Sequence, residues 1–203
     1  MDLTWRIKEL SDIKSAIRSA DAHLQRALLR AIVTMAYAHW EGHVKFSAKS
    51  YMNYIAKRKF LYKSLNIQFS FNKFIPRLLA LKTQGVNTEQ ACAMMGEWIQ
   101  TPDHRFSRIA DRIIDTKNNL RLQNIREICR ICDVASKFFD DKESFIDKML
   151  VDRRNAIAHG ENVYLDMDNL DEFVENAIGL MRSFSDLLIN ACYLENYKRS
   201  YAS

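Results

Sequence analysis

Proline and glycine are scarce in this chain, with two prolines and five glycines among 203 residues. Both residue types mark turns, so their scarcity argues against a β architecture built on many tight turns. Hydrophobic residues make up 48% of the sequence and charged residues 27%, a balance that favours long helices. The composition predicts an all-α protein, and the length predicts a single domain over residues 1–203.

Long apolar runs and a cysteine framework are also missing. The apolar stretch from Ala31 to Ala38 is too short to span a bilayer, and the first residues lack the apolar core of a signal peptide. The four cysteines are too few and too irregular for a secreted disulfide framework. Cys129 and Cys132 have metal-pair spacing, but no second pair follows, so buried thiols are expected. A cytoplasmic protein without membrane contact is predicted.

The charge balance is basic, with a formal net charge of +5 and a pI near 9.0. Such a balance favours contact with polyanions such as nucleic acids. Acidic residues are scattered through the chain, so no single basic block marks a docking surface. Any basic patch must be assembled by folding.

Helical periodicity dominates the first sixty residues. Apolar residues at helical spacing predict an entry helix over residues 3–20 and a much longer helix over residues 21–60. No proline interrupts the long helix, and Gly42 is its one weak point.

Residues 66–116 are expected to be an insertion of short helices and loops. Pro76 is expected in a first helical turn and Asn87 as a helix cap. Pro102 should end or restart the chain before a helical pattern around residues 106–114. The whole is predicted to be a helical bundle with a long early helix and this inserted helical connector.

The C-terminal half continues the helical pattern. An amphipathic helix is predicted after Asn118-Asn119, and another from about Lys142 that ends where Gly160 can adopt a left-handed conformation. The last long helix should follow the acidic turn that begins at Asp168.

One stretch carries chemistry: the run from Arg153 to Gly160 reads Arg-Arg-Asn-Ala-Ile-Ala-His-Gly. An arginine offers a planar fork of donors for phosphate, and a histidine exchanges protons near neutral pH. Arg154 and His159 therefore suit phosphodiester cleavage. Spacing alone is weak evidence, since Arg18 and His23 repeat it by chance, with no asparagine directly after the arginine and no helix-stopping glycine after the histidine.

The setting of this run distinguishes it: an all-helical chain, Asn155 directly after Arg154, and a final helix behind the motif. These features resemble the HEPN superfamily (higher eukaryotes and prokaryotes nucleotide-binding), in particular its stand-alone ribonucleases of bacterial defence and toxin systems. Trp40-Glu41 in the long helix is similar to an element of that branch. The architecture matches over most of the chain, and the specific match lies in residues 153–160.

The resemblance implies a metal-independent endoribonuclease that needs no cofactor and acts as a homodimer on RNA. Two motifs would face each other across a two-fold axis, with Arg154 and His159 as catalytic residues and Asn155, Arg153 and Glu41 as auxiliary ones. A 2′,3′-cyclic phosphate product is expected. An antitoxin or another defence-system protein is a possible partner. Some HEPN toxins have a tyrosine two residues after the histidine for nucleotidylation, whereas Glu161 stands here, so that control is not expected.

Several alternatives stay open. Arg153 offers a second register with five intervening residues, and the run could be only a solvated helix end. His39 and His43 share a helical face, as two metal ligands would, but two ligands do not make a site and none follows downstream. The chain could also be a non-catalytic helical module that binds RNA, nucleotide or protein, or a nuclease acting on DNA.

Overall fold

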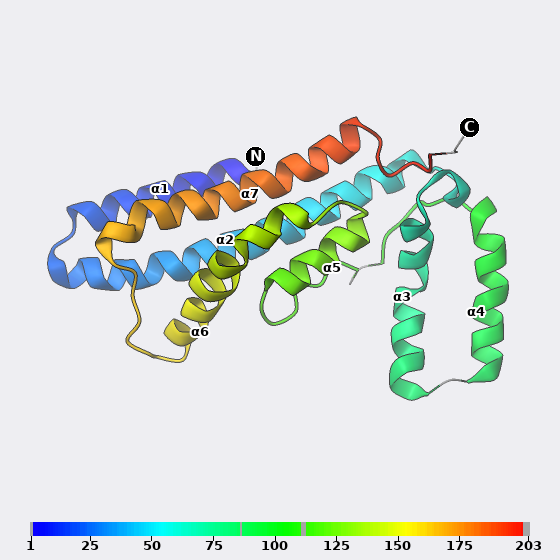
Figure 1. Cartoon of the computed structure of the whole chain (residues 1–203), viewed down its shortest axis with the longest axis horizontal. Helices are drawn as coiled ribbons and strands as arrows, with labels where there is room; N and C mark the ends of the chain where they lie inside the picture. Colours follow the sequence, from blue (N-terminus) through cyan, green and yellow to red (C-terminus); the bar gives the residue numbers. More distant parts are fainter. Residues whose placement is uncertain (1, 86, 111–112, 201–203) are drawn as a thin grey trace. The chain divides into compact units, whose positions relative to one another are not determined.

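The computed structural model describes residues 2–85, 87–110 and 113–200, and most of these are helical (Figure 1). No β-strand forms among them; two isolated bridges are the only extended pairings. The all-α prediction is confirmed. The α-helices are α1 (Asp2–Ser19), α2 (Ala22–Arg58), α3 (Ile67–Gln84), α4 (Thr88–Gln100), α5 (Leu122–Cys132), α6 (Arg153–Ala158) and α7 (Leu170–Tyr193).

The described residues form two compact units, each built from separate stretches of the chain. The first unit contains residues 2–47, 116–126 and 136–186, and the second contains residues 48–110, 113–115, 127–135 and 187–200. Helices α2, α5 and α7 each contribute residues to both units. No helix in the described ranges is both long and apolar enough to cross a membrane.

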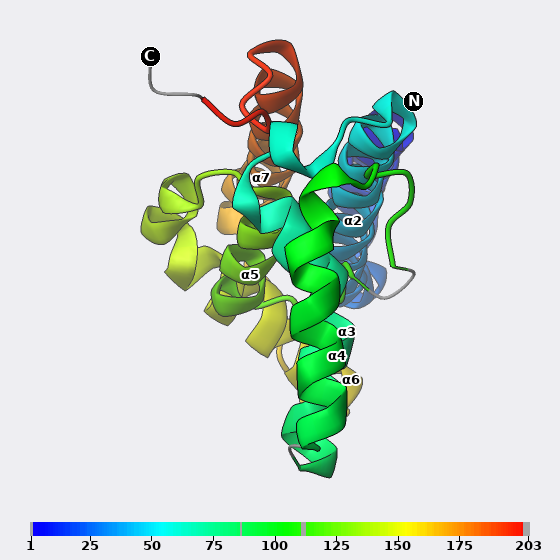
Figure 2. The ribbon, with the colours of Figure 1, turned by 90° about the vertical axis from the view of Figure 1, so that its right-hand side faces the viewer.

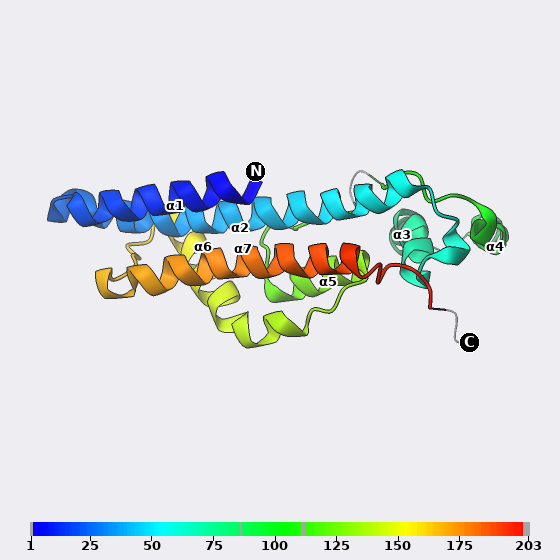
Figure 3. The same cartoon turned by 90° about the horizontal axis from the view of Figure 1, so that it is seen from above.

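The first unit is organised around the N-terminal part of α2, with α1 and α7 alongside it (Figure 3). The side chain of Asp21 begins α2 by accepting the backbone N–H groups of His23 and Leu24, each at 3.0 Å. The core centres on Trp40, whose ring lies 6.2 Å from that of Phe139 and 6.1 Å from that of Phe184. These aromatic contacts fix the α2 and α7 faces that carry the polar groups described below.

Gly42 does not interrupt α2, which runs unbroken through it. A Cβ atom at this position would lie 2.9 Å from Nη1 of Arg6 in α1. At this expected weak point, α1 and α2 therefore approach each other closely, because the missing side chain of Gly42 leaves room for the Arg6 guanidinium.

The second unit contains a helical hairpin of α3 and α4, which run alongside each other in Figure 1 and overlap, with α4 in front, in Figure 2. Asn87 caps α4 as predicted, because its side-chain oxygen accepts the backbone N–H of Gln90 at 3.2 Å. Pro76 corrects another prediction: it lies in the interior of α3 and does not begin a helix. The helix absorbs the loss of one backbone hydrogen bond there.

The helix expected around residues 106–114 is wrong for the described part of that range, which is non-helical. The backbone N–H of Phe106 instead donates to the Phe60 carbonyl at 2.8 Å, and its ring packs 5.6 Å from those of Tyr62 and Phe69. Long-range pairing thus satisfies a backbone that the local pattern assigned to a helix.

The Cys129 and Cys132 side chains are buried thiols in α5, as expected from the sequence. Burial raises the pKa of Cys129 to about 12 and that of Cys132 well above its ordinary value. Thiols held so firmly in the protonated form are poor nucleophiles and poor metal ligands.

Candidate active site

The run from Arg153 to Gly160 forms α6 and its C-terminal cap, and a π-helical segment, Ser144–Asp152, leads into it. At the junction the backbone N–H of Arg153 donates to the carbonyls of Lys148 and Leu150. The π-helical segment contributes Ile146 and Leu150 to the core. Segments of this kind are common at functional sites.

A Schellman arrangement ends α6. Gly160 is left-handed with φ 84°, and its N–H donates to the Ile157 carbonyl at 3.1 Å, while the Glu161 N–H donates to the Ala156 carbonyl at 2.9 Å. The predicted left-handed glycine is confirmed. His159 occupies the cap position and is exposed, so its imidazole is open to a substrate or to a second chain.

Arg154 points toward α2 and the turn before α5. Its Nη2 donates to Oδ1 of Asn119 at 2.8 Å and to the carbonyl of Asn118 at 3.4 Å. The guanidinium carbon lies 4.0 Å from the centre of the Tyr37 ring, in cation–π geometry. A flexible side chain is thereby held in one orientation.

Tyr37 supports Arg154 through its ring. The ring is buried, and the hydroxyl accepts the backbone N–H of Leu120 at 2.9 Å. Burial raises the pKa of Tyr37, and the nearby charge of Glu41 adds to that rise, outweighing the opposite effects of the Leu120 and Arg154 hydrogen bonds. The phenol therefore stays neutral and serves as a stacking surface.

The partners of Arg154 are neutral. No carboxylate within the described residues forms an ion pair with it, and its Nε is buried without an acceptor there. The Nη1 of Arg153 is likewise buried without an acceptor in the described part of the chain. Buried donors normally find a partner, so each of these two arginines keeps hydrogen-bonding capacity that the described residues do not use.

No hydrogen bond joins the side chains of Arg154 and His159 in the described ranges, where Arg154 contacts Asn118 and Asn119 instead. Residues five apart on an α-helix point about 140° from each other. Asn155 links the two only through the backbone, since its carbonyl accepts the His159 N–H at 2.9 Å.

Glu41 lies one helical turn beyond Tyr37 in α2, close enough for its charge to raise the pKa of that tyrosine. It is thus near the support of Arg154 and not on the face of His39 and His43. Those histidines face α1 and α7. His43 Nδ1 lies 2.8 Å from an Asp2 carboxylate oxygen, its Nε2 lies 2.8 Å from Oγ of Ser185, and no metal-type cluster of three or more ligands occurs among the described residues.

Sequence reasoning missed four residues around the motif: Tyr37, Asn119, Arg26 and Arg30. Arg30 donates to the carbonyl of Glu161 at 2.6 Å and to that of Val163 at 3.4 Å, directly after the cap. Arg30 and Tyr37 lie seven residues apart on one face of α2. This periodicity indicates that the two side chains share a helical face, but it does not indicate that the face lies near the motif. Asn119 carried no signal beyond its place before a helix.

The helical architecture and an Arg-x4-His motif at a capped helix end define a HEPN-type protein. The chain belongs to the RiboL-PSP-HEPN family, whose model matches residues 1–190. This confirms the resemblance drawn from the motif and extends it over nearly the whole chain. No curated protein and no solved structure matches the chain.

Proposed function

We propose that this protein is a metal-independent endoribonuclease in which Arg154 and His159 cleave RNA. The observation that carries the proposal is the state of Arg154: its guanidinium is fixed by Asn119 and Tyr37 but not neutralised. A fixed, uncompensated cation is suited to a phosphate whose negative charge grows in the transition state. Membership of a HEPN family adds support for a nuclease or another RNA-related role.

In the proposed mechanism, the 2′-hydroxyl of the ribose attacks the adjacent phosphorus atom and the bond to the 5′-oxygen breaks. His159 handles a proton at the attacking 2′-oxygen or at the leaving 5′-oxygen, and Arg154 binds the negatively charged phosphorane. The products are a 2′,3′-cyclic phosphate and a 5′-hydroxyl. Asn155, Arg153 and Glu41 are proposed auxiliary residues, with Arg153 as a second phosphate ligand.

A homodimer is part of the proposal, because no hydrogen bond joins the side chains of Arg154 and His159 within the described part of one chain. A two-fold axis near α6 would place His159 of each protomer beside Arg154 of the other. An isologous contact of this kind is the commonest form of homo-oligomer. The proposed setting is the bacterial cytoplasm, in a defence or toxin–antitoxin system with a neutralising protein partner.

The test is cleavage of single-stranded RNA and of a DNA of the same sequence in the presence of a chelator. The proposal expects the RNA alone to be cut, with a cyclic phosphate end, and expects Arg154→Ala and His159→Ala variants to be folded but inactive. Binding of RNA without cleavage by the folded dimer would contradict the proposal and leave a non-catalytic HEPN module. Cleavage of the DNA would contradict the 2′-hydroxyl mechanism.

A further inference from the structure

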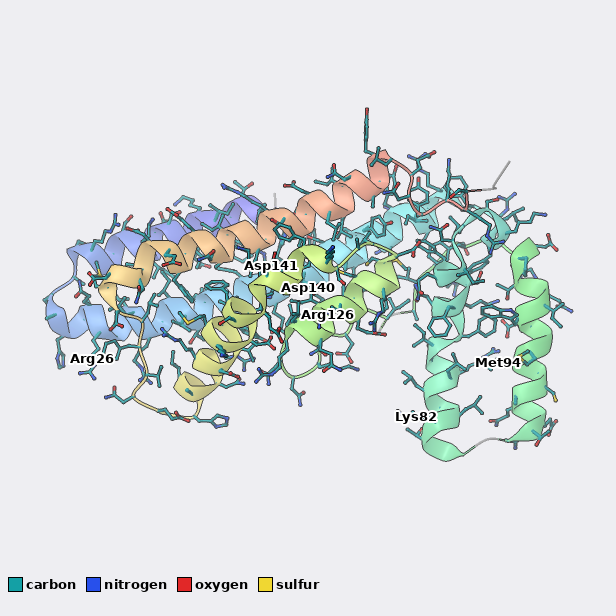
Figure 4. The ribbon with its side chains drawn as sticks, in the orientation of Figure 1. Arg26, Lys82, Met94, Arg126, Asp140 and Asp141 are labelled. Carbon is teal, nitrogen blue, oxygen red and sulfur yellow. The ribbon has the colours of Figure 1, made fainter. Side chains whose placement is uncertain are left out.

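Several arginines of the first unit can be compared by their partners. Four of them contact carboxylates: Arg6 with Asp2, Arg18 with Asp171, Arg121 with Asp152 and Arg126 with Asp140. Arg26 and Arg30 contact no carboxylate within the described residues, as is also true of Arg154. Figure 4 shows the contrast between Arg126, which lies beside Asp140, and Arg26, which extends from the start of α2 away from any labelled acid.

Neutral groups hold both Arg26 and Arg30 in place. Arg26 donates to the side-chain oxygen of Asn162 at 3.2 Å, and its guanidinium carbon lies 4.7 Å from the centre of the Tyr164 ring. Arg30 donates to the backbone carbonyls of Glu161 and Val163, and not to the Glu161 carboxylate. These contacts orient both side chains without a carboxylate partner among the described residues.

Arg26 and Arg30 also form a row with the support of Arg154. Arg26, Arg30 and Tyr37 follow one another at intervals of four and seven residues, which places them on one face of α2. At the helical rise of 1.5 Å per residue, the row extends about 16 Å along the helix. The row and the segment 161–164 that it contacts both adjoin the candidate active site.

We infer that Arg26 and Arg30 bind backbone phosphates of the RNA next to the bond that is cut, as an extension of the site at Arg154. This inference rests on the proposed ribonuclease function and adds a place where the flanking nucleotides lie. Neutral carbonyl, amide and ring contacts orient the two guanidinium groups before the substrate arrives, which lowers the entropy cost of binding. Each guanidinium then offers its remaining N–H donors to a phosphate.

The contacts that Arg26 and Arg30 make with residues 161–164 also hold the segment after His159 in place. This structural role has to be separated from phosphate binding. Lysine keeps the positive charge but cannot reproduce the planar fork or the ring contact. Glutamine loses the charge. An Arg26→Lys/Arg30→Lys variant therefore reports on the loss of the orienting contacts alone, and an Arg26→Gln/Arg30→Gln variant reports on the loss of charge and contacts together.

The experiment measures binding of a single-stranded RNA oligonucleotide to the full-length His159→Ala protein across a range of salt concentrations. The slope of log affinity against log salt falls by about 0.7 for each lost phosphate contact, so the Gln double variant should lose about 1.4. The Lys double variant should retain the slope. An Arg18→Gln/Arg126→Gln variant has the same net charge as the Gln double variant and should also retain it.

An unchanged slope in the Gln double variant, with RNA still bound, would overturn the inference and leave the ribonuclease proposal intact. An equal loss in the Lys and Gln variants would also overturn it, because fastening of the 161–164 segment and not charge would then be responsible. No RNA binding by the parent, together with no RNA cleavage by the wild-type protein, would overturn both proposals.

Discussion

Helix α2 carries charged and titratable groups on two faces, and the groups on the two faces have different kinds of partner in the first unit. Toward α1, His43 hydrogen-bonds to Asp2, and Nε2 of His39 lies 2.7 Å from a Glu9 carboxylate oxygen. On the other face, Arg30 contacts only backbone carbonyls and Tyr37 contacts Arg154. Toward α1 the basic groups contact carboxylates directly, whereas the arginines on the other face contact carbonyl, amide and ring groups, with Glu41 near Tyr37 as the acidic group there.

The comparison explains why His39 and His43, which have the spacing of two metal ligands, act as packing residues. Burial lowers the pKa of His39, which keeps its ring neutral in the contact between α1 and α2. Both ring nitrogens of His43 have partners within hydrogen-bonding distance in the protein. Ring nitrogens that are occupied in this way are not available to a metal ion.

The largest effect is expected at Arg154. Arg154→Lys keeps the charge but removes the fork that Asn119 and the phosphate share, so the cleavage rate should fall about 100-fold, as for the loss of one transition-state donor. Single-turnover cleavage of an RNA oligonucleotide measures the rate. The control is Arg126→Lys, which changes an exposed ion pair and should cleave at the wild-type rate. Equal rates for the two variants would show that the fork has no role.

The next largest effect is expected on the face of α2 that packs against α1, where basic groups pair with acidic ones. It is a loss of stability. Burial alone would raise the pKa of Asp2, but the hydrogen bonds from Arg6 and His43 outweigh it and lower the pKa below the ordinary 3.8. Asp2→Asn should therefore reduce the free energy of unfolding by about 2 kcal/mol at neutral pH, since it removes one partner of a largely buried ion pair. Denaturant titration measures the loss.

The pH dependence of this effect follows from the direction of the shift. A carboxyl group with a lowered folded-state pKa contributes its full stability above the unfolded value near 3.8, and that stability is lost as the pH falls through the folded pKa. The difference between wild type and Asp2→Asn should be constant from pH 8 to pH 5 and should shrink below about pH 4. A difference that grows on acidification would contradict the assigned role.

A pair of substitutions at Tyr37 should separate stacking from hydrogen bonding. Tyr37→Phe keeps the ring under Arg154 but leaves the Leu120 N–H without its acceptor, so it should cost about 1–2 kcal/mol of stability with most of the cleavage rate retained. Tyr37→Leu also removes the ring, a cation–π contact of about 1–2 kcal/mol, and should lower the rate about tenfold.

Thermal unfolding and single-turnover rates distinguish the two Tyr37 variants. Phe and Leu variants with equal rates, at equal occupancy of the folded state, would remove Tyr37 as a positioning residue. The KM for RNA should change less than kcat, because the ring orients a group that acts mainly in the transition state.

The smallest effect is expected at Gly42. Alanine is favoured over glycine in a helix by about 1 kcal/mol, but a Cβ here would displace the mobile end of Arg6 from its contacts. The two effects oppose each other, so Gly42→Ala should change the free energy of unfolding by less than about 1 kcal/mol. RNA cleavage should be unaffected. A loss of cleavage would mean that the α1 face of α2 is coupled to the motif.

Sequence periodicity was sufficient to predict the long helices and the end of α6, because residues within a few helical turns determine these features. Gly160 was recognised from its position after His159 alone. The interior position of Pro76 and the extended segment after Arg105 could not be predicted in this way, since long-range contacts such as that of Phe106 with Phe60 outweigh local pattern.

The candidate site shows the same division. Arg154, Asn155 and His159 were found from adjacency in the sequence, whereas Asn119 and Tyr37 lie 35 and more residues away and come into place only on folding. The π-helical turn before Arg153 left no pattern that periodicity could detect. Nothing in the sequence distinguished arginines with acidic partners from those held by neutral groups.

The most direct test of the central claim is RNA cleavage in chelator by an equimolar mixture of Arg154→Ala and His159→Ala proteins after subunit exchange. Each variant alone should be an inactive, folded dimer. The mixture should recover up to about a quarter of the wild-type activity, because half of the dimers are mixed and each of these has one intact pair of Arg154 and His159 across the two-fold axis. No recovery from folded, exchanging dimers would contradict the composite site, and activity in either parent alone would contradict the catalytic assignment.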